Sequence, residues 1–319
     1  MDLCICGDTA SKLLGKLSRN ELLNLDLVDA SDVVFSNLDW KESRDLAQSI
    51  WGESQIAADI LVRDPLKRAR GSGATYHVWS SEIPPGSLAR YSENIVVALP
   101  WFELIRRAKE LDIRKISKDL MRLTAIYDPS EGSGDDLPAC EPLITREALE
   151  HYVDSAKGER GISKVREALS WSPPNARSPR EIDLTLAFSS PRRLGGCELP
   201  VPELNHQVDL GSDAAKMLGK KVVFTDLFWK RRMKDKCDCG AEYLGEKDHP
   251  SIGPELTRVN ALELEGIELH LITNDQMKDA KQLLMSAKRI ARAIGYTPFG
   301  SRWPSEGELQ SHIDKILAI

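Results

Sequence analysis

The spacing of hydrophobic residues changes along this chain and divides it into stretches with different expected structures. Residues 8–50 carry apolar side chains at helical spacing, as in DTASKLLGKLSRNELLNL and DWKESRDLAQSIWG, and this pattern predicts short helices. Residues 58–63, 74–80 and 94–100 then form short apolar runs separated by the turn sequences GSG and IPPGS, which predicts strands. Two helices are expected next, over about 101–111 and 113–126.

The segment YDPSEGSGDDLPACEP, residues 127–142, is rich in glycine, proline and acids and predicts a linker. A chain of 319 residues fits two domains. We therefore expect an α+β N-terminal domain over residues 1–126 and a second domain over residues 143–319, with its core over 178–295.

The second domain has a regular order of patterns. After helices at TREALEHYVDSAKG and GISKVREALSW, a helix is expected at SPREIDLTLAF and strands at LNHQVDL, KVVFTDLFW and CGAEYL. A helix at GPELTRVNALELEG, the strand IELHLIT and a helix over about 275–295 complete the series. This order predicts an α/β fold with a mixed β-sheet flanked by helices.

The composition fits an ordinary globular protein, with 41% hydrophobic and 29% charged residues. A net charge of −6 argues against a uniformly basic nucleic-acid-binding surface but permits a local basic patch. No apolar run approaches the length of a membrane span, and the N-terminus MDLCICGDTASKLL lacks the basic region of a signal peptide. The expected location is the cytoplasm, without membrane contact.

Three acids fall within the secondary structure expected for the second domain. Glu181 lies on its first helix, Asp226 interrupts the strand VVFTDLFW, and Glu242 lies on the next strand. Burying an ionised carboxylate is unfavourable unless it is paired or bound to a metal ion. Acids on two adjacent strands and a helix can converge on Mg²⁺, which activates water and stabilises charge on a phosphate.

Simpler interpretations remain open for each position. The sequence Ser178-Pro179-Arg180-Glu181 matches a capping box, in which Glu181 only bonds back to the helix start. Alternation places Asp226 on the strand face of Phe224 and Phe228, but an acid there can also end the strand or face solvent.

Glu242 and His249 in AEYLGEKDH can likewise belong to a strand and turn whose polar side chains lie on the protein surface without a further role. A histidine in this position is a general acid or base in one interpretation and a surface loop residue in the other.

The combined motifs resemble the endonuclease-like domain related to the very-short-patch-repair endonucleases, within the PD-(D/E)XK nuclease superfamily. The matching text is SPREIDLTLAF, LPVPELN, VVFTDLFW, AEYLGEKDH and ELTRVNALELEGIELHLIT. The resemblance implies a restriction-endonuclease-like sheet and a DNA substrate. It also implies a Mg²⁺ or Mn²⁺ ion held by Asp226 and Glu242, with Glu181 and His249 as further catalytic residues, and it places Arg258 in the family's R-x-N-A-L helix.

One position departs from that pattern. Relatives carry aspartate or lysine two residues after the strand glutamate, whereas this chain has Leu244. A leucine cannot bind a metal ion or orient water, so a group from the following turn, Glu246, Lys247 or Asp248, would have to replace it. Leu244 therefore leaves two hypotheses: an active endonuclease, or a catalytically degenerate nuclease-fold protein that binds DNA or acts as an antitoxin-like regulator.

Basic residues bracket the strand that carries Asp226. The seven are Lys220, Lys221, Lys230, Arg231, Arg232, Lys234 and Lys236. We predict phosphate contacts from Lys230, Arg231, Arg232 and Lys234, together with Arg258; the alternative is a solvated loop.

The N-terminal region and the cysteines also carry predictions. The N-terminal region resembles the region that precedes such domains in actinobacterial proteins, some of them abortive-infection antitoxin-like, through the residues YHVWSSEIPPGSLARYSENIVVALPWFELIRRAKELDI. This resemblance implies a protein partner for the N-terminal region.

The six cysteines are expected to be reduced thiols. A zinc site made by Cys237 and Cys239 with Cys197 or His249 is a third hypothesis, although Cys-x-Cys is an uncommon zinc spacing.

Overall fold

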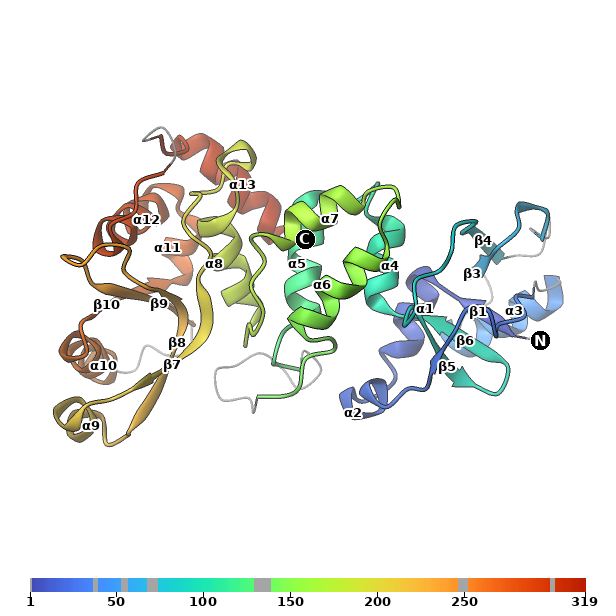
Figure 1. Cartoon of the computed structure of the whole chain (residues 1–319), viewed down its shortest axis with the longest axis horizontal. Helices are drawn as coiled ribbons and strands as arrows, with labels where there is room; N and C mark the ends of the chain where they lie inside the picture. Colours follow the sequence, from blue (N-terminus) through green and yellow to red (C-terminus); the bar gives the residue numbers. More distant parts are fainter. Residues whose placement is uncertain are drawn as a thin grey trace. The chain divides into compact units, whose positions relative to one another are not determined.

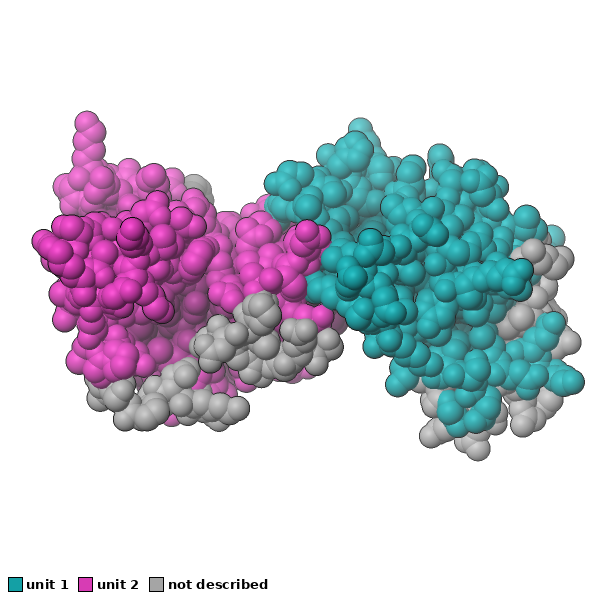
Figure 2. Space-filling model, turned by 90° about the horizontal axis from the view of Figure 1, so that it is seen from below, with its two compact units in different colours: residues 1–112, 143–166 teal, residues 113–142, 167–319 magenta. Residues whose placement is uncertain are grey.

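The computed structural model describes residues 2–36, 40–52, 57–67, 74–128, 139–245, 252–298 and 302–319. The chain folds into two compact units, coloured separately in Figure 2. Unit 1 contains residues 1–112 and 143–166, and unit 2 contains residues 113–142 and 167–319. Each unit therefore takes two separate stretches of the chain.

Unit 1 is built around a six-stranded mixed sheet (Figure 1) with the order β2-β5-β6-β1-β3-β4. The strands are β1 (Leu3–Ile5), β2 (Leu27–Val28), β3 (Ala58–Val62), β4 (Ala74–Val78), β5 (Leu88–Ser92) and β6 (Ile95–Ala98). Strand β1 pairs in parallel with β6 and antiparallel with β3, and β3 pairs in parallel with β4. The central strands β1, β3 and β6 are largely apolar, as expected for strands covered on both faces.

The helices described in unit 1 are α1 (Gly7–Leu14), α2 (Arg19–Leu23), α3 (Trp40–Trp51), α4 (Pro100–Arg107) and α6 (Arg146–Ser155), with a 3-10 turn η1 (Pro65–Lys67). Helix α7 (Ile162–Leu169) begins in unit 1 and ends in unit 2. Leu13 and Leu14 of α1 pack with Ile5, Ile60 and Val62 of the sheet in one apolar cluster. Burial of these side chains, at roughly 1.5–3 kcal/mol each, holds the helix against the sheet.

Unit 2 contains a four-stranded sheet in the order β10-β9-β8-β7. Its strands are β7 (Glu203–Asp209), β8 (Val222–Trp229), β9 (Asp238–Leu244) and β10 (Ile267–Thr273). Strands β9 and β10 are parallel, in a register that runs from Asp238↔Ile267 to Leu244↔Thr273, and the other two pairings are antiparallel. The helices are α5 (Ile113–Leu123), α8 (Pro179–Ser189), α9 (Ser212–Leu218), α10 (Ile252–Leu264), α11 (Asn274–Lys278), α12 (Ala280–Ile294) and α13 (Glu306–Leu317), with a 3-10 turn η3 (Arg192–Leu194).

Helices cover this sheet on both faces (Figure 1). On one face, Phe188 of α8 meets Trp229 of β8 edge to face, with ring centroids 6.0 Å apart. On the other face, Leu262 of α10 packs with Phe228 and Leu269 of the sheet. The prediction of an α/β fold with a mixed sheet flanked by helices is confirmed for residues 178–295, and the N-terminal half adds a second mixed sheet.

Several elements differ from the sequence prediction. The helix expected over 275–295 is two helices, because Asp279 leaves the helical conformation and caps α12 by accepting the backbone N–H groups of Lys281 and Gln282. The pattern did not predict the short strands β1, β2 and β5. It also did not predict the helices α9 and α13. The compact units also differ from the expected domains, because α5 belongs to unit 2 and α6 to unit 1. Residues 129–138 of the expected linker lie outside the described residues.

None of the described helices is long and apolar enough to cross a membrane.

Candidate functional site

A row of polar residues crosses the sheet of unit 2. The register of β7 with β8 sets Leu204 against Leu227 and His206 against Thr225, so Asn205 and Asp226 stand level with one another. The register of β8 with β9 pairs Leu227 with Ala241, and one further step puts Asp226 level with Glu242. Asn205, Asp226 and Glu242 therefore occupy one level on three neighbouring strands.

Glu181 joins this row through Asn205. Its Oε2 accepts the amide N–H of Asn205 at 3.0 Å and the backbone N–H of Arg177 at 2.8 Å. The Ser178 hydroxyl accepts the Glu181 backbone N–H at 3.1 Å, so the N-cap half of the expected capping box is present, while the Glu181 carboxylate bonds the backbone of Arg177. The Glu181 carboxylate is nevertheless not a mere surface cap, because it is almost fully buried and ties α8 to β7.

Asp226 lies where the regular alternation of β8 breaks. Strict alternation would put Val223 and Phe228 on opposite faces, yet both belong to one apolar cluster, and Phe224 is exposed while Phe228 is buried. The expectation that Asp226 shares a face with Phe224 and Phe228 is therefore wrong. Instead, Oδ2 of Asp226 accepts the backbone N–H of Tyr243 on β9 at 2.9 Å. The side chain thus takes the place of a ladder carbonyl at an irregular point of the sheet.

Backbone strain marks the same level on β7. Asn205 has a φ of 52°, in the left-handed region that asparagine adopts more readily than most residues. Its side chain also donates to the carbonyl of Asn175 at 2.8 Å, and Asn175 itself has a φ of 69°. Sequence reasoning missed Asn205; its place in the LPVPELN motif was the available signal.

Glu242 is paired with Arg258. The Nε of Arg258 donates to Oε1 and Oε2 of Glu242 at 2.8 and 2.9 Å, and Nη2 lies 2.5 Å from Oε1. Nη2 also donates to the backbone carbonyl of Phe224. The exposed fractions are only 11% for the Glu242 side chain and 27% for Arg258, so water screens this bidentate pair weakly.

The other residues considered for the expected site are His249, the turn before it and Leu244. His249, with Glu246, Lys247 and Asp248, falls outside the described residues. Leu244 is half-buried at the end of β9, opposite Thr273 of β10, and offers no donor or acceptor from its side chain.

This arrangement does not fit a divalent metal site. Both Glu242 oxygens accept N–H groups of Arg258, one Asp226 oxygen accepts a backbone N–H, and Leu244 supplies no ligand. Among the described residues, no three Asp, Glu, His or Cys side chains lie close enough together to hold a metal ion. Asp226 and Glu242 therefore lie at one level of the sheet, and Glu181 is hydrogen-bonded to Asn205 at that level. Each of the three carboxylates accepts hydrogen bonds from N–H groups of the protein.

The basic residues divide into two groups. Lys220 and Lys221 precede the eight-residue strand β8, and Lys230, Arg231, Arg232 and Lys234 follow it. At about 3.3 Å per residue, the strand separates the groups by roughly 25 Å. All six of these side chains are exposed, while Lys236 is half-buried.

Cys197 belongs to no group of described residues that could hold a metal ion, which contradicts the zinc hypothesis for this residue. This thiol is fully buried, and burial raises its pKa to about 12. Cys237 contacts Glu268 and the carbonyl of Ala293, at 3.9 and 3.8 Å from its sulfur. None of the six cysteines is in a disulfide bond, and Cys197, Cys237 and Cys239 form no metal-binding group with other described residues.

Unit 1 contains a partly buried polar network that the sequence did not reveal. Nε2 of His77 lies 2.8 Å from Asp59, and Nδ1 lies 3.0 Å from Nη1 of Arg106, whose Nε and Nη2 donate to Glu103. A guanidinium can only donate, so Nδ1 accepts and Nε2 carries the proton. Thr9 also bonds the Asp59 carboxylate. Burial alone would raise the pKa of Asp59, but the hydrogen bonds from His77 and Thr9 outweigh it and lower the pKa.

This network borders a polar hollow in unit 1. The lining residues are Tyr76–Ser81, Arg106, Lys109, Glu110 and Gly158–Arg160. Cations and carboxylates both line it, so its charge selects no class of ligand. Both ring nitrogens of His77 are engaged, which leaves neither as an available general base.

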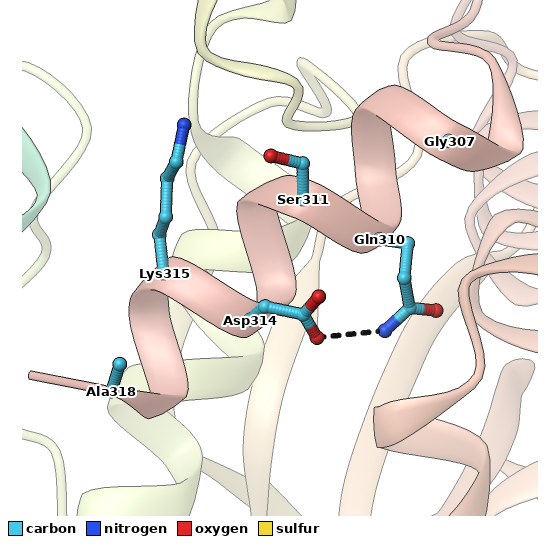
Figure 3. Close-up of a pocket in the computed structure, with 6 residues that line it drawn as sticks. All are labelled: Gly307, Gln310, Ser311, Asp314, Lys315 and Ala318. Carbon is cyan, nitrogen blue, oxygen red and sulfur yellow. Dashed lines mark hydrogen bonds between the residues drawn. The ribbon is translucent and has the colours of Figure 1, made fainter.

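A second hollow lies along α13 (Figure 3) and is lined by Gly307, Gln310, Ser311, Asp314, Lys315 and Ala318. All six residues belong to this one helix or its end, and a hydrogen bond of 3.0 Å joins Gln310 to Asp314. Gln310 also bonds Ala280 and Lys278, so its role is to fix α13 against α11 and α12. No catalytic grouping results.

Comparison with descriptions of known protein families, with curated proteins and with solved structures yields no match for this chain.

Proposed function

We propose that this chain binds nucleic acid through the loop between β8 and β9, on a sheet of restriction-endonuclease-like type. The observation that carries the proposal is the charge of that loop. Lys230, Arg231, Arg232 and Lys234 are exposed within five positions, in a protein of net charge −6. None of the four side chains forms an ion pair with a described residue, whereas many cations elsewhere are paired. Phosphate groups are the natural partners of such a cluster.

The loop is also held in place, which favours binding at a defined surface. The Arg232 backbone N–H donates to the carbonyl of Ile294 at 2.7 Å, and its guanidinium lies over the ring of Tyr296 at 5.4 Å. The Arg231 backbone N–H donates to Asp238 at 2.8 Å. Fixed cations lose less conformational entropy on binding than those of a flexible tail.

Charge reversal tests this proposal, with fluorescence anisotropy of labelled DNA as the measurement. We expect the double variant Lys230→Glu/Lys234→Glu to weaken binding at least about tenfold at low salt, and to reduce the dependence of affinity on salt. The matched control is Lys220→Glu/Lys221→Glu, which changes the net charge equally at the other end of β8. Equal losses in both variants, or no binding of DNA by the wild type at low salt, would contradict the proposal.

A metal-dependent endonuclease is the second candidate. It is favoured by the alignment of Asp226 and Glu242 on adjacent strands and by the motif resemblance. It requires the Glu242–Arg258 pair to open, because that pair engages both Glu242 oxygens. Plasmid nicking in Mg²⁺ or Mn²⁺ tests it. Cleavage by the wild type that is lost in Asp226→Ala would favour this candidate, and equal cleavage by both proteins would remove Asp226 from the site.

A further inference from the structure

The guanidinium of Arg258 is bound by the kinds of ligand that hard cations take. It donates hydrogen bonds to both carboxylate oxygens of Glu242 and to the backbone carbonyl oxygen of Phe224. Carboxylate and carbonyl oxygens are the groups that bind Mg²⁺ and Ca²⁺ in proteins. The Glu242 oxygens come from β9, at the level that Glu242 shares with Asp226, and the Phe224 carbonyl comes from β8, two residues before Asp226, whereas the cation comes from α10.

We propose that Arg258 takes the place of a metal ion in this protein. Its guanidinium group permanently supplies the positive charge beside the three acids Glu181, Asp226 and Glu242, which we call the acid row. The buried Glu242 needs a positive partner, since an unpaired carboxylate at 11% exposure would be destabilising. Arg258 supplies that partner from within the chain. The pair therefore makes the sheet independent of divalent ions, and Leu244 agrees with this role because no ligand is needed two residues beyond Glu242.

The planar, bidentate geometry distinguishes this contact from an ordinary surface ion pair. Arg289, for comparison, approaches Glu268 at 3.7 Å and is 65% exposed. A pair of that kind contributes little to the stability of the fold and leaves the carboxylate accessible to water. The Arg258 contact instead occupies both Glu242 oxygens at 2.8 and 2.9 Å from one nitrogen.

The inference concerns the acid row and stands without the nucleic-acid proposal, so it can be tested in the absence of DNA. The probe is Tb³⁺, a hard cation whose luminescence is sensitised by nearby tyrosine or tryptophan, with Mn²⁺ titration calorimetry as a second readout. We expect Arg258→Met to bind Tb³⁺ at least about tenfold more tightly than the wild type, since removing the bidentate partner releases two carboxylate oxygens. Adding Glu242→Gln to this variant should abolish the gain.

Three further variants serve as controls for Tb³⁺ binding. Arg289→Met removes an arginine from the looser pair in the same unit and should gain no binding. Glu242→Gln in the wild-type background should leave Tb³⁺ binding unchanged, because Arg258 already occupies that carboxylate. Arg258→Gln keeps a hydrogen-bond donor without the charge and should also gain binding, which covers the case that Arg258→Met does not fold.

The proposal is overturned if wild-type protein binds Tb³⁺ as tightly as the Arg258 variants and loses that binding with Glu242→Gln. It is also overturned if a folded Arg258 variant, verified by circular dichroism, gains no binding. Failure of DNA binding in the charge-reversal experiment would leave this result untouched.

Discussion

The Nζ of Lys118 lies 2.6 Å from Oδ1 of Asp183, and the two side chains are only 5% and 4% exposed. This ion pair joins α5 to α8 in the interior of unit 2. Lys118 also donates to the carbonyl of Ile316 at 3.0 Å, which brings α13 into the same contact. Burial raises the pKa of Asp183, although Lys118 opposes that shift.

Lys118→Met should therefore be strongly destabilising, because it removes the nearest cation from the buried Asp183 and leaves the longer contact with Arg180, at 3.4 Å. We expect a loss of about 3–5 kcal/mol in the free energy of unfolding, measured by urea denaturation. The matched control is Lys115→Met on the same helix, whose partner Asp119 is more exposed, at 24%. That change should cost about 0.5 kcal/mol or less. Similar losses in the two variants would contradict the assignment of a buried, interdependent pair.

Gly7→Ala should destabilise unit 1 through both conformation and contact. Gly7 has a φ of +60°, and an added Cβ would lie 2.9 Å from Cγ of Asp59, which Thr9 and His77 hold in place. A left-handed alanine costs about 1 kcal/mol, and displacement of Asp59 should roughly double that loss.

Gly86→Ala provides the control for Gly7→Ala. Gly86 has a φ of +76° with no atom within 4 Å of the added Cβ, so it tests conformation alone. Thermal melts of both variants separate the two effects, and an equal shift in Tm would remove the contact with Asp59 from the explanation.

Asp2 gives unit 1 a defined dependence on pH. Its hydrogen bond from Arg90 lowers the pKa below the ordinary value of 3.8. A lowered pKa means that the folded state favours the charged carboxylate, so this stabilisation is present above 3.8 and is lost as pH falls through the lower folded value.

Asp2→Asn should consequently be less stable than the wild type by about 1 kcal/mol at pH 7, and the difference should shrink between roughly pH 5 and pH 2. Urea unfolding across that range is the measurement. The exposed Asp8→Asn serves as control, since Asp8 is 79% exposed and lies 3.5 Å from Arg107. A gap between wild type and Asp2→Asn that stays constant with pH would show that the charge of Asp2 is not responsible.

The sheet of unit 2 could be predicted from sequence because its strands are long and clearly bounded. The run IELHLIT coincides with β10, and CGAEYL lies within β9. The short strands of unit 1 were harder, since Leu3–Ile5 offers three apolar residues and Leu27–Val28 only two. Such runs are stabilised by pairing with distant strands, which local patterns do not encode.

The candidate site was predictable in part. The levels of Asp226 and Glu242 follow from two neighbouring antiparallel strands, and the motif order made them candidates. Their partners were not predictable, because the Glu242–Arg258 pair joins residues 16 positions apart through the placement of a helix over the sheet. The hydrogen bond from Tyr243 to Asp226 depends on a break in strand alternation that no spacing rule indicates.

The order in which the chain visits the two units limits how this protein can be divided or recombined. It runs through unit 1, unit 2, unit 1 again and then unit 2, with crossings after residues 112, 142 and 166. No single break in the gene therefore yields one intact unit. A fragment that ends before residue 127 takes α5 and Lys118 away from Asp183. Exchange of one unit between related proteins would need three coordinated junctions, so the two units are expected to be inherited together.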